Sequence, residues 1–98
     1  MQELVRVEII YSQALDEDFT LAFKEAGVAK RFTKLDNVMG AGCSTPRMGD
    51  NVWPQLNMMY LIFCEKEEAE KIQEIVNRIR GQYTTEGVAC FISSAMQG

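Results

Sequence analysis

Three observations predict an α+β protein in which four strands form one antiparallel sheet and two helices cover one of its faces. Short runs alternate apolar and polar residues, which is typical of strands. Two longer runs place apolar residues at helical spacing, and the segments follow the order βαββαβ. The 98 residues are 47% hydrophobic and 24% charged, which is the balance of a globular protein, so we expect a single domain over residues 1–98.

The first half of the chain predicts a strand, a helix and a second strand. Leu4–Tyr11 alternates branched apolar residues with charged ones, as a strand with one face in water does. A helix is expected from Leu15, because acidic residues follow at its start and Gly27 can end it in the left-handed conformation. Arg31–Val38 mixes charged and apolar residues and predicts the second strand.

The second half predicts a strand, a helix and a last strand. Leu56–Phe63 is nearly all apolar, as expected for a central strand covered on both faces. Glu65–Arg80 carries one apolar stripe at helical spacing, and Gly81 is expected to end this helix. Val88–Ile92 is the last strand. This order is that of the ferredoxin-like fold, with both helices on one face of the sheet. Because that fold hosts unrelated functions, function must be argued from sites.

Charge and hydropathy count against two classes of partner. The formal net charge of -4 does not suit a surface that binds nucleic acid, which concentrates lysine and arginine. No apolar run approaches the roughly 20 residues that span a bilayer, and the first residues lack the order of a signal peptide. We therefore expect no nucleic-acid partner, no membrane insertion and a cytoplasmic location.

No arrangement typical of a catalytic site is found, so we do not expect an enzyme. The chain has no histidine and no glycine-rich phosphate motif followed by a helix. Asp16–Asp18 falls at a helix start, where acidic side chains compensate the helix dipole. Cys43, Cys64 and Cys90 are odd in number and lack C-x-x-C spacing, which predicts reduced thiols, with Cys64 and Cys90 as inert core residues.

The connection from Gly40 to Asn57 is the least ordinary segment of the sequence. It is much longer than a hairpin of about two to five residues, and long connections in compact domains are often binding elements. Met48, Val52 and Trp53 lie in it, and large apolar groups are costly to leave in water. We expect them to pack on a ligand, on a neighbouring subunit or on the domain itself, with Met48 and Trp53 as partner contacts in a 43–57 loop.

Short motifs in this layout resemble the P-II signalling superfamily, whose small βαββαβ subunits carry a long loop, the T-loop, at the same connection. The resemblance covers nearly the whole chain in layout. It is carried by residues at both ends of the first helix and by a segment that is similar to the family's Val-x-Gly-x-Gly at the base of the T-loop. These matches are Leu15–Glu17, Glu25–Val28 and Val38–Gly42.

The resemblance implies a homotrimer that binds a small-molecule effector in the cleft between subunits and signals through the loop to a protein target. It assigns binding to the base of the loop and to the segment before the last strand. The corresponding residues here are Gly40, Gly42, Cys43, Ser44, Arg47 and Gly87, with Arg47 as a candidate anion contact. The family's nucleotide binders carry a lysine where this chain has Val88, so a nucleotide is one candidate and the cofactor stays unknown.

Two other functions stay open. The related CutA family shares the trimeric architecture and is linked to divalent cations. Met39, Cys43 and Met48 are soft ligands on one loop that would suit copper(I), which gives the alternative of a metal-binding trimer. The further alternative is a structural module for oligomerisation, in which Trp53 would fill an interface.

Overall fold

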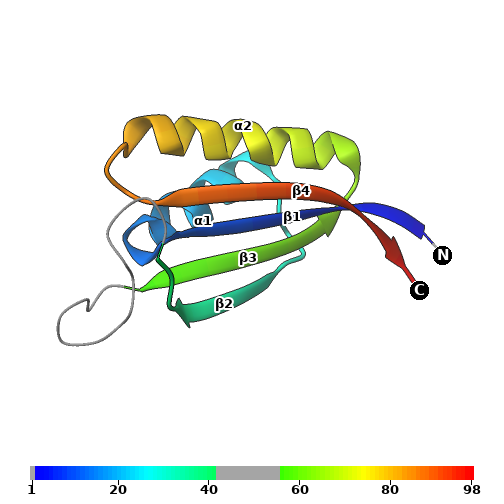
Figure 1. The fold of residues 1–98 in the computed structure, drawn as a ribbon. Coiled ribbons are helices and arrows are strands. Elements are labelled where there is room, and N and C mark those ends of the chain that lie inside the picture. Colours follow the sequence, from blue (N-terminus) through cyan, green and yellow to red (C-terminus); the bar gives the residue numbers. More distant parts are fainter. Residues whose placement is uncertain (1, 42–55) are drawn as a thin grey trace.

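The computed structural model describes residues 2–41 and 56–98, and it confirms the predicted ferredoxin-like order of elements. The elements are β1 (Gln2–Ser12), a short 3-10 helix η1 (Gln13–Leu15), α1 (Asp16–Ala26), β2 (Thr33–Val38), β3 (Asn57–Cys64), α2 (Lys66–Gln82) and β4 (Val88–Gln97). The strands form one sheet in the order β2-β3-β1-β4, and every neighbouring pair is antiparallel (Figure 1). Both helices therefore cross over one face of an antiparallel sheet.

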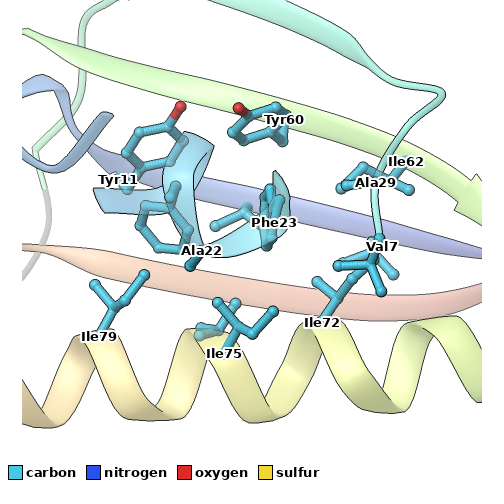
Figure 2. Close-up of a cluster of buried hydrophobic side chains, with 14 of the residues drawn as sticks. Val7, Tyr11, Ala22, Phe23, Ala29, Tyr60, Ile62, Ile72, Ile75 and Ile79 are labelled. Atoms are coloured by element: carbon cyan, nitrogen blue, oxygen red, sulfur yellow. The ribbon is translucent and has the colours of Figure 1, made fainter. Parts of the chain in front are cut away.

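The core lies between this face and the two helices. Val7, Ile9 and Tyr11 are fully buried on β1. Successive side chains of a strand point to opposite faces, and these three point toward the helices. Side chains of α2 and α1 meet those of β1 and β3 in this cluster (Figure 2). Aromatic rings pack in its centre, where the ring centroids of Tyr11 and Phe19 are 4.6 Å apart.

The turn after α1 follows the prediction. Gly27 adopts φ of 68° and ends the helix, and the next residue's backbone N–H, from Val28, donates to the carbonyl oxygen of Phe23 at 3.0 Å. Ala29 also has a positive φ, of 54°, and its N–H donates to Oε2 of Glu68 at 3.0 Å. The start of α2 thus holds the turn that leads into β2.

Several boundaries differ from the sequence-based expectations. Gly81 does not end α2, because among the described glycines only Gly27 has a positive φ and the helix continues to Gln82. Strand β4 runs five residues beyond the expected Ile92, since its backbone pairs with β1 up to the pair of Gln2 and Gln97. In β3 only the helix-facing side is buried, and Phe63 on the other side is 46% exposed. A single protomer therefore leaves one face of the sheet uncovered.

Among the described helices, none combines the length and apolar character that crossing a bilayer requires.

Candidate functional site

The strand ends that flank the long connection gather at one end of the sheet (Figure 1). They are Ser12–Gln13, Val38–Gly40, Leu56–Asn57 and Gly87–Val88, and we call this region the loop end. The N–H of Ser12 donates to the carbonyl oxygen of Gly87 at 3.1 Å, and that of Gln13 to the carbonyl oxygen of Leu56, also at 3.1 Å. Two adjacent residues of β1 and η1 thus hold both the foot of the long connection and the segment before β4.

A bulge in β2 sets the direction of the chain as it enters the connection. Leu35 pairs with Met59 and Val38 pairs with Asn57, so β2 has one more residue than β3 between these pairs. Asn37 lies in the bulge with φ of 55°, a conformation that asparagine tolerates better than most residues. A bulge re-aims the strand beyond it, so Asn37 determines where Val38 and Gly40 lie.

Gly40 lies close to a side chain of the same protein, that of Asn57. A Cβ placed on Gly40 would lie 2.8 Å from Nδ2 of Asn57, closer than real Cβ atoms come. The φ of Gly40 is not positive; among the described glycines only Gly27 has a positive φ. The absence of a side chain on Gly40 therefore leaves room for the Asn57 amide at the base of the connection.

A partly buried ion pair fastens β2 to α1. Nζ of Lys34 lies 2.6 Å from Oδ1 of Asp16, and the hydroxyl of Tyr11 donates to the same oxygen at 2.7 Å. The ammonium of Lys34 also lies 4.9 Å from the ring centroid of Tyr60, within the range of a cation–π contact. Asp16, expected only to compensate the helix dipole, thus joins three elements.

The same contacts shift two pKa values. Burial raises the pKa of the Tyr11 hydroxyl far above its ordinary value, and the hydrogen bond to Asp16 raises it further. For Lys34 burial acts to lower the pKa, but the hydrogen bond and charge of Asp16 outweigh it, so the net pKa is raised. At neutral pH Tyr11 therefore stays protonated and Lys34 stays charged.

A second contact holds the segment before β4. The hydroxyl of Tyr83, the residue after α2, donates to Oδ1 of Asp18 at 2.8 Å. The pKa of Tyr83 is raised by this hydrogen bond and by the charge of Asp18. Together with the bond from Ser12 to Gly87, it fixes both ends of residues 83–87.

An open pocket borders the loop end on the side of α1. Its charged lining residues are Lys34 and four acidic ones, Asp16, Glu17, Asp18 and Asp36. Among the residues that the structure describes, no group of three or more cysteine or acidic side chains is arranged to hold a metal ion. The described part of this surface is therefore acidic, and its one lysine is already paired.

The structure brings two of the predicted site residues to the loop end but places them at opposite edges. Gly40 follows β2 on one edge of the sheet, and Gly87 precedes β4 on the other, with β3 and β1 between them. Three strand spacings of about 4.8 Å separate these edges, or about 14 Å. Met39 is exposed, at 63%. The predicted residues Gly42, Cys43, Ser44, Arg47, Met48 and Trp53 lie outside the described residues.

Comparison of the sequence with models of known families gives no match. No curated protein matches it either.

Solved structures with the same fold do match. CPII from Thiomonas intermedia K12, in a structure with ADP and bicarbonate, is 22% identical with a TM-score of 0.78, over 99% of this chain and 90% of that one. The same protein with ADP, AMP and bicarbonate gives 21% identity and a TM-score of 0.76, over 99% and 94% of the two chains. A protein of Thermus thermophilus described as PII-like and signaling is 18% identical with a TM-score of 0.66, over 95% and 87%. The expected P-II-like architecture is confirmed at the level of the fold.

Proposed function

We propose that this chain, which has the fold of the P-II-like proteins, is a regulatory protein that binds a small effector at the loop end and signals through the connection between β2 and β3. The fold comparisons support the regulatory class, since CPII is described as a nitrogen regulatory PII-like protein. One structural observation carries the placement of the site. Ser12 and Gln13 hold Gly87 and Leu56, so the segment before β4 and the foot of the connection share one anchor.

This anchor offers a way for binding to affect the loop. An effector that binds differently to two arrangements of the loop shifts the population between them. The bulge at Asn37 and the close packing of Gly40 on Asn57 give the loop a fixed base, so the segment beyond is the part that responds. A protein target that contacts residues 43–57, with Met48 and Trp53 as contacts, would then sense occupancy.

The proposed assembly is a homotrimer with the effector between subunits. Gly40 and Gly87 lie on opposite edges of the sheet within one protomer, so a small ligand contacts both more readily where the β2 edge of one copy meets the β4 edge of the next. A head-to-tail contact of this kind closes into a ring when the rotation permits. The uncovered face of the sheet supplies apolar surface for such a contact.

The effector class is proposed from the ligands of CPII and from the charges of the residues near the loop end. CPII structures contain ADP, AMP and bicarbonate, so adenine nucleotides and bicarbonate are the first candidates. The pocket that borders the loop end on the side of α1 is acidic and its Lys34 is paired with Asp16, so we propose that anion binding depends on backbone N–H groups and on Arg47. We therefore propose a weakly charged anion such as bicarbonate ahead of a polyphosphate.

Equilibrium dialysis against ADP, AMP, bicarbonate and copper(I) tests the proposal. Saturable binding of one of the anions, weakened in Arg47→Met and unchanged in Lys71→Met, is the expected result, since Lys71 is an exposed cation on α2. Binding of copper(I) alone, lost in Cys43→Ser, would favour the metal-binding alternative with Met39 and Met48. Binding of none of the four would favour a structural module.

Two further features belong to the proposal. The protein acts by binding and not by catalysis, and it works in the cytoplasm. Cys64 and Cys90 are free thiols, which suits a reducing compartment.

A further inference from the structure

The face of the sheet turned away from the helices is largely apolar. It carries Ile10, Leu35, Met59, Leu61, Phe63 and Phe91, drawn from all four strands. Phe91 is 59% exposed, Phe63 46% and Leu35 44%. Exposed apolar surface that is shared by neighbouring strands marks a contact surface more often than isolated apolar residues do.

An ion pair lies in the middle of this apolar face. Arg6 and Glu8 are on β1, which runs between β3 and β4, and the register places Arg6 opposite Phe63 and Glu8 opposite both Leu61 and Phe91. The guanidinium Nη2 of Arg6 donates to Oε1 of Glu8 at 2.9 Å. The central carbon of that guanidinium lies 6.0 Å from the ring centroid of Phe63. The side chains of Arg6 and Glu8 are 40% and 23% exposed.

The pair restricts what can cover the face. A guanidinium has five N–H donors and a carboxylate accepts about four hydrogen bonds, so the one bond between Arg6 and Glu8 uses a small part of their capacity. An apolar partner would bury this capacity without satisfying it, which is costly. A second copy of the same chain brings one guanidinium and one carboxylate in equal number, set in the same apolar surroundings.

We propose that Arg6 and Glu8 form the polar centre of the contact between copies of this chain, and that this pair selects the number and orientation of the copies. The inference rests on the proposed homotrimer and assigns it a determinant. The surrounding apolar side chains supply most of the contact area, but apolar surfaces alone can pack on each other in several relative positions of the two copies. Around a threefold axis, each Arg6 meets the Glu8 of a neighbour, and only an arrangement that pairs every charge satisfies both groups.

Sedimentation velocity and native mass spectrometry over a series of protein concentrations test this proposal on the full chain. Arg6→Met and Glu8→Leu each leave one charge without its partner. Each should therefore raise the dissociation constant of the assembly by about 100-fold or more. The double variant with both changes should still associate, but as a mixture of species. The charge swap Arg6→Glu with Glu8→Arg should restore one species. Arg78→Met, which removes a cation from the exposed side of α2, is the matched control.

Circular dichroism checks that each variant is folded, which is expected because both side chains are partly exposed in the single protomer. If the wild type is a trimer and both single variants assemble as it does, the proposed trimer stands and the role of Arg6 and Glu8 is wrong. If the double variant forms the same single species as the wild type, the apolar face selects the assembly by itself. A wild type that stays monomeric overturns the trimer and this inference together, while the dialysis experiment still tests effector binding.

Discussion

Gly40 and Asn57 meet at the base of the long connection, where a Cβ on Gly40 would lie 2.8 Å from Nδ2 of Asn57. The resemblance assigned Gly40 to effector binding, and in the structure the group that lies close to it is a side chain of the same protein. Asn57 is the first residue of β3, so its side chain lies against the backbone of the chain that enters the connection.

Gly40→Val should therefore disturb the base of the connection while leaving the core intact. The branched side chain collides with the Asn57 amide, which must move, and effector affinity should fall about tenfold or more, which is the effect of about 1.4 kcal/mol. Isothermal titration with the effector found by dialysis measures it. Gly81→Ala is the matched control, because a Cβ on Gly81 meets nothing within 4 Å and the change should stabilise α2 by about 0.5–1 kcal/mol. Equal affinities of Gly40→Val and the wild type would remove this contact from the site.

The bulge in β2 leads to a prediction about Asn37. Valine disfavours the positive φ of 55° found there, so Asn37→Val should cost about 1–3 kcal/mol in the free energy of unfolding. Asn37→Gly should cost little or be slightly stabilising, since glycine adopts this conformation freely. Urea denaturation of the three proteins compares these values. A valine variant as stable as the wild type would mean that the strand pairs without the bulge in solution.

The sequence was sufficient for the order of the elements, because each has a local signal. Gly27 takes the left-handed conformation expected of a residue that ends a helix, and the buried Phe19 and Phe23 show the expected helical spacing. The same rule was wrong at Gly81, because a glycine can also continue a helix. Residues 93–97 of β4 were missed since they are mostly polar and pair with β1 through backbone bonds, which leave no side-chain signal.

The candidate site was harder to predict from the sequence for a related reason. The bonds from Ser12 to Gly87 and from Gln13 to Leu56 join main-chain atoms, so residue types do not reveal them. Lys34 and Asp16 are far apart in the sequence, and their pairing depends on how α1 lies against β2. Asn37 was the exception. An asparagine inside a run that otherwise indicates a strand is a sign of a bulge, so the sequence alone contained a signal for this feature.

Lys34 leads to a prediction on stability and pH. Its pKa is raised in the folded protein, so its contribution to stability is fully present below the unfolded value of about 10.4 and is lost as the pH rises through the folded value. Lys34→Met should cost about 1–3 kcal/mol at pH 7, because Asp16 loses a charged partner. The difference from the wild type should shrink above about pH 10.4.

Chemical denaturation at pH 7 and at alkaline pH measures both effects of Lys34→Met. Tyr11 also ionises more readily in the unfolded chain, but this contribution is shared by wild type and variant and largely cancels in their difference. Lys71→Met, at an exposed position of α2, should change stability little at either pH. A constant difference across the pH series would show that the ion pair contributes nothing through its charge.

The three cysteines should react with thiol reagents at different rates, and the order tests where the effector binds. Burial raises the pKa of Cys64, and the charge of Glu68 raises it further. Burial also raises the pKa of Cys90, against the opposing charge of Arg80. Since the thiolate is the reactive form, both should react more slowly than an ordinary thiol at pH 8. Cys43, beside the glycines at the base of the proposed binding loop, should therefore be modified first.

Effector binding should then slow the reaction of Cys43 and leave the rates at Cys64 and Cys90 unchanged, because only Cys43 belongs to the proposed site. Peptide mass spectrometry after short exposures to iodoacetamide, with and without effector, gives the three rates separately. Cys43→Ser checks that the fast phase belongs to that residue. Protection of all three thiols together would indicate a general loss of opening motions on binding. Modification of Cys64 or Cys90 ahead of Cys43 would contradict the location proposed for the effector.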